Sequence, residues 1–254
     1  MAGERGMRPW PPGFIETLDE RLRRGEHLAL YGPRGSGKSA VLAELHSRLT
    51  QARVPCALSS STRSLDDITR ALEQAYPGVK TLEVTRRAAR SRLWWAADQR
   101  FGVLLLDHLS EVSNAMVGFL RRLHGRVVGV LSAVDVEDVR ERSQMKPWRY
   151  GAFSVRMPLA TSRQLRRLLH ARCAILGLPP HDEEQEHRLL HQARGRPGWI
   201  IQCTELERDA RYWCAHGLLI SVLCTDTEAA VRLRALDLVR PPARRSASSA
   251  PPAR

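Results

Sequence analysis

Two patterns of apolar residues alternate along the chain as far as Leu159. Short apolar runs predict strands at His27–Tyr31, Val54–Ser59, Gly102–Leu106, Arg126–Ser132 and Ala152–Met157. Between them, apolar residues three and four positions apart predict helices at Phe14–Arg24, Lys38–Ala52, Ser64–Tyr76, Leu82–Gln99, Ser110–His124 and Val134–Ser143. This alternation predicts an α/β fold in which a parallel five-stranded sheet is sandwiched by helices.

After Leu159 the pattern becomes mainly helical. It predicts helices at Ser162–Leu176, Asp182–Arg194 and Gly198–His216, a brief β-like run at Leu218–Cys224, and a last helix at Asp226–Val239. We therefore expect an irregular N-terminal arm (1–13), an α/β domain (14–159), a small helical domain (160–239) and a disordered basic tail (240–254).

Composition excludes several classes of protein. With 43% hydrophobic residues among 254, the chain can form a core, and its longest apolar runs fall far short of the ~20 residues of a membrane-spanning helix. The N-terminus lacks the apolar core of a secretion signal. The five cysteines are scattered and form no CxxC pair, which argues against a disulfide framework or a zinc site. We expect a cytoplasmic protein with reduced thiols.

The net charge of +13 comes almost entirely from arginine. Three lysines, Lys38, Lys80 and Lys146, leave 37 of the 40 basic residues as arginine. Such an excess is typical of GC-rich genomes, so the high charge is weak evidence for nucleic-acid binding. A lysine at a meaningful position is correspondingly more informative.

One of these lysines lies in a glycine-rich motif between a predicted strand and a predicted helix. The motif GxxxxGK[ST] is matched by Gly32, Pro33, Arg34, Gly35, Ser36, Gly37, Lys38 and Ser39. Its glycines let backbone N–H groups surround a phosphate, and the helix N-terminus adds positive potential. Lys38 is expected to reach the β- and γ-phosphates and Ser39 to bind Mg²⁺. The alternative is a chance glycine-rich turn.

An acidic residue that could help to hold the metal follows a predicted buried strand. Asp107 comes directly after four apolar residues, Val103–Leu106, at the end of a strand where α/β proteins bind ligands. We expect Asp107 to hold Mg²⁺ through water. The alternative is a solvated aspartate at the strand end.

These two motifs resemble the AAA+ class of P-loop ATPases. In that class a polar residue called sensor 1 ends the fourth strand, and the resemblance gives this role to Ser132, with Asp135 just beyond. An ordinary strand-ending serine is the alternative. The class also carries an arginine finger that acts on a neighbouring subunit, which the resemblance places at Arg149, with Arg140 and Arg142 as rivals.

The resemblance continues into the helical region. Met157-Pro158-Leu159 resembles the entry to the helical lid of the class, and Ala193–Gly198 resembles the sensor 2 region of its origin-recognition-like and transposition-helper branches. This similarity implies that Arg196 or Arg194 contacts the nucleotide. The alternative is a helix corner, with Gly195 ending one helix and Pro197 starting the next.

One position departs from the class. Active AAA+ enzymes usually have glutamate directly after the Walker B aspartate, and this chain has His108, with Glu111 further on. A histidine can act as a base, although in a different geometry. Three interpretations stay open: slow hydrolysis through Glu111 or His108, activation by a partner, or a nucleotide-gated switch that scarcely hydrolyses.

Arginine clusters offer candidate phosphate contacts for nucleic acid. They are Arg86, Arg87, Arg90 and Arg92 near Trp94 and Trp95; Arg121, Arg122 and Arg126; and Arg163, Arg166 and Arg167. Solvated arginine faces and buried tryptophans are an equal alternative. The resemblance implies an ATP- and Mg²⁺-dependent helper that self-associates head to tail and acts on DNA. A regulatory switch that recruits a protein partner is the alternative function, and a small-molecule kinase fits the long helical region poorly.

Overall fold

A computed structural model of the chain describes residues 10–60, 65–75, 102–109, 114–123, 128–135, 151–215 and 217–237. The expected helix at Leu82–Gln99, the tail from residue 240 and most of the N-terminal arm lie outside these residues. Within them, no helix combines the length and apolar character needed to cross a membrane.

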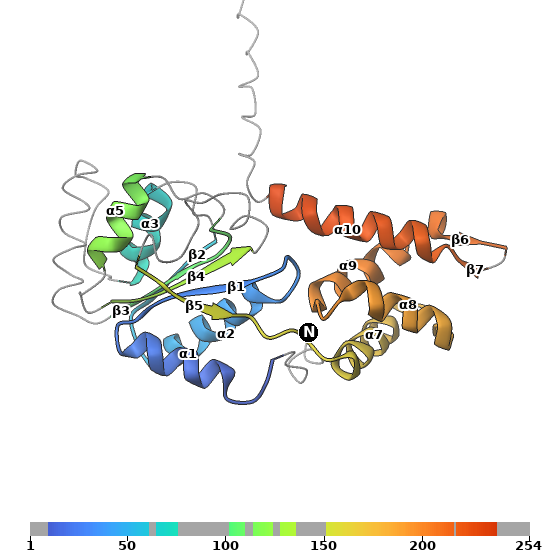
Figure 1. Cartoon of the computed structure of the whole chain (residues 1–254), viewed down its shortest axis with the longest axis horizontal. Helices are drawn as coiled ribbons and strands as arrows, with labels where there is room; N and C mark the ends of the chain where they lie inside the picture. The colour runs from blue at the N-terminus through green and yellow to red at the C-terminus, as the bar shows by residue number, and fades with distance from the viewer. Residues whose placement is uncertain are drawn as a thin grey trace, which may run out of the picture.

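The centre of the fold is a parallel five-stranded sheet (Figure 1). Its strands are β1 (His27–Gly32), β2 (Cys56–Ser59), β3 (Gly102–Leu106), β4 (Val128–Asp135) and β5 (Phe153–Arg156). They lie in the order β2-β3-β4-β1-β5, so β1 and β4 are neighbours although about 100 residues separate them. The register pairs Gly32 with Asp135 at their carboxyl ends. The predicted parallel sheet is confirmed.

Helices cover both faces of this sheet. On one face lie α1 (Phe14–Arg23) and α2 (Lys38–Gln51), and on the other α3 (Leu65–Ala75) and α5 (Asn114–Leu123). Side chains alternate along each strand, so Val103 and Leu105 pack with α1 and α2, while Leu104 and Leu106 pack with α3 and α5. All residues of β3 are buried, as its apolar sequence predicts.

The C-terminal helical region lies beyond the carboxyl ends of the strands, where the arrows of β4 and β5 point in Figure 1. It contains α7 (Ser162–Leu176), α8 (Glu183–Ala193), α9 (Pro197–Glu207), a 3₁₀ turn (Ala210–Tyr212), the short strands β6 (Trp213–Cys214) and β7 (Gly217–Leu218), and α10 (Ile220–Asp237). Capping boxes begin α7 at Thr161 and α8 at Asp182. Its separate core contains the fully buried Trp199 and Tyr212.

Three predicted element boundaries are wrong. The helix expected at Gly198–His216 ends at Glu207, because the chain turns into a two-stranded hairpin that places Tyr212 in the core. The β-like run expected at Leu218–Cys224 is mostly helical, since α10 begins at Ile220. The helix expected from Val134 does not begin there, because β4 continues along β1 as far as Asp135. The first and third errors arose where long-range packing ended or extended a local pattern.

A buried ion pair joins α9 to the loop before α8. His181 Nε2 lies 3.0 Å from Glu207 Oε1, and the two side chains are 4% and 0% exposed. The other ring nitrogen, Nδ1, lies 3.8 Å from Cys173 Sγ. Burial disfavours the charged imidazole, but hydrogen bonds to Cys173 and Glu207 outweigh it and raise the pKa of His181 to about 10. The helical region therefore contains a charged histidine across the neutral pH range.

We expect this pair to make stability depend on pH. Because the pKa of His181 is higher in the folded chain than its ordinary value of 6.5, the stabilisation is complete below pH 6.5 and is lost as pH rises towards 10. The loss in free energy of unfolding is about 2–4 kcal/mol over that range. Urea denaturation at pH 6.5, 8 and 9.5 measures it. His181→Gln should flatten the profile, whereas His187→Gln, at an exposed position of α8, should retain it; equal slopes in both variants would contradict this assignment.

Candidate functional site

The glycine-rich motif forms the loop between β1 and α2, as predicted. Gly35 and Gly37 have φ angles of 78° and 99°, in the left-handed region that favours glycine. Gly37 is the N-cap of α2, and no side chain caps that helix. The first N–H groups of a helix have no partner within it, so the N-terminus of α2 offers donors and positive potential to an anion.

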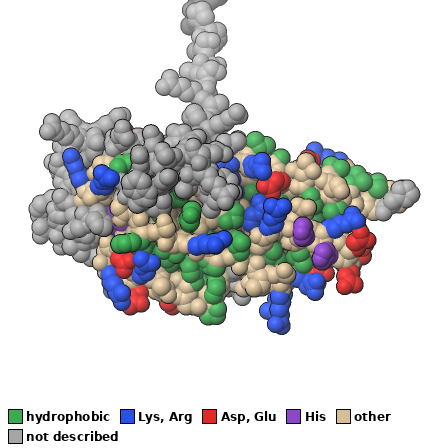
Figure 2. All heavy atoms as spheres, in the orientation of Figure 1, with side chains coloured by type: hydrophobic (Ala, Val, Ile, Leu, Met, Phe, Trp, Pro, Cys, Tyr) green, Lys and Arg blue, Asp and Glu red, His purple; other side chains and the backbone are tan. Residues whose placement is uncertain are grey.

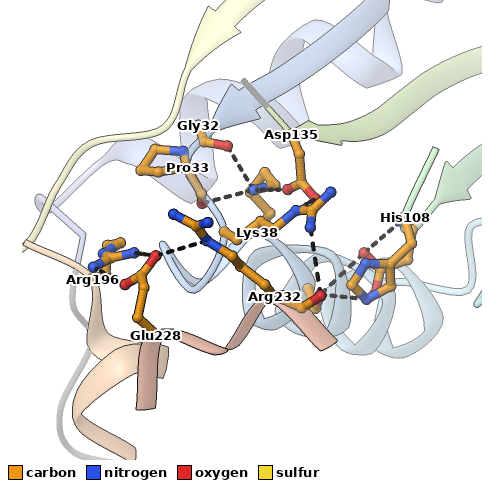
Figure 3. A network of polar contacts seen from close by, with 11 residues as sticks. Gly32, Pro33, Lys38, His108, Asp135, Arg196, Glu228 and Arg232 are labelled. Atoms are coloured by element: carbon orange, nitrogen blue, oxygen red, sulfur yellow. Dashed lines mark hydrogen bonds and ion pairs between the residues drawn. The ribbon is translucent and has the colours of Figure 1, made fainter. Parts of the chain in front are cut away.

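Lys38, the first residue of α2, points back into this loop (Figure 3). Its side chain is 8% exposed. The ammonium group donates to the carbonyl oxygens of Gly32 at 2.8 Å and Pro33 at 3.0 Å, and it pairs with Asp135 Oδ1 at 2.7 Å. The lysine that the motif predicts is therefore paired with Asp135, a residue of β4.

The predicted metal ligands lie together next to the loop. The Ser39 hydroxyl donates to Asp107 Oδ1 over 3.1 Å, which brings the end of β3 to the start of α2. A hydroxyl and a carboxylate are oxygen ligands of the kind that Mg²⁺ prefers. The convergence of these oxygens beside a loop that can hold phosphates fits a Mg²⁺–nucleotide complex.

His108 lies at the same place. Its Nε2 is 3.5 Å from Ser39 Oγ and 3.6 Å from Asp107 Oδ2, and its backbone N–H donates to Asp107 Oδ1 at 2.9 Å. The residue has a φ of 51°, an uncommon conformation for a non-glycine residue. This backbone turn directs the imidazole towards Ser39. The departure from the class at position 108 therefore places a titratable group beside the predicted metal ligands.

The end of β4 differs from the prediction. Ser132 does not end the strand; it is fully buried within the sheet, and its hydroxyl donates to the Leu28 carbonyl at 3.3 Å. The strand ends at Asp135, whose carboxylate contacts Lys38 and also lies 3.2 Å from Arg34 Nε. The sequence signal for Asp135 was the one that identified Asp107, an aspartate after an apolar strand. The strand therefore continues three residues beyond the predicted end at Ser132.

The C-terminal helical region touches the glycine-rich loop directly. The Gly198 N–H, in the first turn of α9, donates to the Gly35 carbonyl at 2.8 Å. A Cβ atom on Gly198 would lie 3.0 Å from both the Cα and the carbonyl oxygen of Gly35, so the two backbones are in contact. The sequence motif at Pro197-Gly198 thus marks the place where α9 meets the loop.

Arg196 is held within the helical region. Its guanidinium pairs with Glu228 of α10 at 2.8 Å and donates to the carbonyls of Ala193 and Gln192, both at 3.0 Å. The Arg196 hydrogen bond also keeps the pKa of Glu228 below its ordinary value. Arg194 is exposed at the C-cap of α8. Sequence analysis missed Glu228, because nothing in the local pattern of α10 indicates a partner for Arg196.

The sequence of residues 21–134 matches the family model for the AAA domain. This segment is similar to that family. The match and the observed sheet confirm the predicted resemblance to the AAA+ class of P-loop ATPases. A search of curated protein sequences finds no match.

Solved structures with the same fold include Cdc6p from Pyrobaculum aerophilum, with a TM-score of 0.56 and 16% identity over 79% of this chain and 62% of that one. A Walker-type ATPase of Pyrococcus abyssi matches with a TM-score of 0.55 and 14% identity, over 89% of this chain and 73% of that one. Orc1 of Aeropyrum pernix, in a complex with DNA, matches with a TM-score of 0.53 and 16% identity, over 87% of this chain and 66% of that one. The chain therefore spans under two thirds of the Cdc6p and Orc1 chains.

Several residues that the sequence analysis singled out lie outside the described residues. They are Glu111, Arg149 with its rivals Arg140 and Arg142, Arg126, and the cluster of Arg86, Arg87, Arg90 and Arg92 with Trp94 and Trp95.

The predicted arginine clusters that the structure describes lie on helix surfaces. Arg121 and Arg122 are exposed on α5, and Arg163, Arg166 and Arg167 are exposed on α7. On the face shown in Figure 2, basic side chains are spread over the sheet-containing part and the helical region, with acidic side chains among them. This distribution does not by itself favour nucleic acid over a solvated surface.

Proposed function

We propose that the chain is an ATP-binding AAA+ protein and a Mg²⁺-dependent ATPase that works as an oligomeric helper on DNA. The observation that carries the proposal is the meeting of Lys38, Ser39 and Asp107 beside the N-terminus of α2. These groups provide a cation for phosphate and oxygen ligands for a metal on one rigid frame, the ends of β1, β3 and α2. In this proposal, residues 14–159 form the ATPase domain and residues 160–239 its lid.

Each residue has a role that follows from its position. The free N–H groups of α2 and the ammonium of Lys38 bind the phosphates, while Ser39 and Asp107 hold the metal. Bound there, Mg²⁺ would neutralise charge that develops on the phosphate oxygens. His108, beside Ser39, takes a proton from the attacking water, with Glu111 as the alternative base.

The remaining roles come from the AAA+ resemblance. Asp135, at the end of β4, replaces Ser132 as the proposed sensor 1 residue. Arg149 is the proposed arginine finger for a neighbouring subunit. Arg196 contacts nucleotide in this proposal only after it separates from Glu228, to which it is paired in the structure. The AAA domain and the likeness in fold to Orc1, which was solved with DNA, support a DNA-related helper.

A second function, a nucleotide-gated switch with little hydrolysis, is favoured by one observation. The residue after Asp107 is a histidine in a left-handed conformation, where an active AAA+ enzyme usually has glutamate. Such a protein would bind ATP or ADP at the same loop and recruit a protein partner. The two functions share the nucleotide site and differ in turnover.

Phosphate release from ATP separates the two functions. We expect the wild-type chain to release phosphate in Mg²⁺, to lose this activity in EDTA, and to exceed the Lys38→Ala variant at least ~10-fold, because phosphoryl transfer depends on the lysine and the metal. Wild-type turnover no faster than that of Lys38→Ala would reject the ATPase and leave the switch. Assembly is tested by measuring the size of the protein in solution with ADP, with a slowly hydrolysed ATP analogue, and with the analogue plus DNA. An increase in size with the analogue supports an oligomer. An increase only when DNA is added identifies DNA as the partner.

A further inference from the structure

The ammonium group of Lys38 is saturated in the structure. A lysine has three N–H donors, and Lys38 has three oxygen partners within 3.0 Å: the Gly32 carbonyl, the Pro33 carbonyl and Asp135 Oδ1. Two of these partners are neutral and belong to the loop itself. The third is a full negative charge brought from β4 (Figure 3). A phosphate oxygen can therefore reach Lys38 only by replacing one of these contacts.

Asp135 is the partner that a phosphate would replace. Its carboxylate bridges two cations of the loop, Lys38 at 2.7 Å and Arg34 at 3.2 Å, so it already occupies the position of an anion. The Lys38 and Asp135 side chains are 8% and 12% exposed, so solvent and salt screen their attraction little. Backbone pairing fixes the placement, because the register of β1 and β4 sets Asp135 beside Gly32.

We infer that Asp135 is an internal competitor for phosphate, which holds Lys38 and lowers the affinity for nucleotide. The inference rests on the proposed function, since it concerns the same nucleotide site. When a site is open for only a fraction of the time, the apparent affinity equals the intrinsic affinity multiplied by that fraction. Lys38 carries a full positive charge, so an incoming polyphosphate is attracted to it while it displaces Asp135.

The test measures binding by titration calorimetry in EDTA, with ADP and inorganic tripolyphosphate as probes. Asp135→Asn keeps the shape of the side chain and removes its charge. We expect it to bind both probes about tenfold more tightly than the wild type, because the open fraction rises. The affinity for adenosine, which has no phosphate, should be the same in Asp135→Asn and in the wild type.

Two controls separate displacement from a general effect of charge. Asp19→Asn makes the same change in net charge on α1, where Asp19 pairs with Arg23. Asp107→Asn removes a carboxylate from the site itself, where Asp107 contacts Ser39 and His108. In each of these two variants we expect the affinity for ADP and tripolyphosphate to rise less than threefold. A second variant, Asp135→Ser, should also tighten binding, and it keeps the test decisive if Asp135→Asn fails to fold in a thermal-unfolding control.

The outcomes distinguish this inference from the proposed function. If neither the wild type nor the Asp135 variants bind ADP or tripolyphosphate, the nucleotide site itself is rejected. If the wild type binds and the Asp135 variants bind equally or more weakly, the site stands and Asp135 is not a competitor. An equal gain in Asp107→Asn would likewise overturn the inference, because it would reduce the effect to long-range charge.

Discussion

The Lys38→Ala variant is expected to bind ATP and ADP at least ~100-fold more weakly than the wild type. Hydrogen bonds to a charged group contribute about 1.5–3 kcal/mol each, and the lysine is the cation at the centre of the loop. Competition titrations with a fluorescent ADP analogue measure the loss. The effect should be the same in Mg²⁺ and in EDTA, because Lys38 acts on phosphate and not through the metal.

The fold should survive this change. Removing Lys38 leaves Asp135 beside Arg34 at 3.2 Å, so the partly buried carboxylate keeps a cation. Circular dichroism and thermal unfolding check this point. Arg24→Ala is the matched control, since it removes one positive charge from an exposed ion pair with Glu20 at the end of α1. Binding by Lys38→Ala within threefold of the wild type would place the nucleotide site elsewhere.

The second large effect concerns the contact between α1 and the sheet. Gly129 lies in β4, and a Cβ atom on it would stand 2.2 Å from the carbonyl oxygen of Leu22 in α1. Because both groups belong to the backbone of packed elements, the clash cannot be relieved by a side chain alone. We expect Gly129→Ala to lower the free energy of unfolding by about 3 kcal/mol or more, as overpacking of a dense core does. Urea denaturation measures the change.

Gly118 provides the opposite control for the same substitution. It lies exposed within α5, and a Cβ atom there would meet no other atom within 4 Å. Gly118→Ala should stabilise the chain by about 0.5–1 kcal/mol, because alanine favours a helix over glycine. If the free energy of unfolding of Gly129→Ala lies within about 1 kcal/mol of the wild-type value, the close approach of α1 to β4 would be contradicted.

The contact between Gly198 and Gly35 connects the two parts of the chain at the site. The loop that would hold phosphate gives its Gly35 carbonyl to α9, and Arg34 of the same loop approaches the Arg232 carbonyl of α10 at 3.5 Å. The loop and the helical region are thus in direct contact through the Gly35 and Gly198 backbones.

Much of the fold was predictable from local sequence. The wholly apolar run Gly102–Leu106 became a buried central strand, and Ser162–Leu176 became a helix with the predicted bounds. A strand buried on both faces leaves a continuous apolar run, whereas a helix buried on one face leaves apolar residues three and four positions apart. These two patterns can therefore be recognised in the sequence without the structure. The glycine-rich motif was equally clear, because its residues are contiguous and each has a local conformational or chemical requirement.

Three of the failures share one cause, which is contact between residues that are distant in the sequence. The end of β4 was placed at Ser132, because the apolar pattern gave no sign that pairing with β1 carries the strand to Asp135. The partner of Arg196 is Glu228, more than thirty residues away in α10. The hairpin Trp213–Leu218 interrupted a helical pattern because Tyr212 is drawn into the core.

The sequence by itself determined the alternation of strands and helices, the glycine-rich loop between β1 and α2, and the presence of Asp107 and His108 after β3. These features follow from periodicity and from residues that are adjacent in the chain. The tertiary structure decided that β4 lies beside β1, and so that Asp135, not Ser132, faces Lys38. It also decided that α9 rests on Gly35. The physical reason is that strand order and helix docking are set by the burial of whole surfaces, which no local segment encodes.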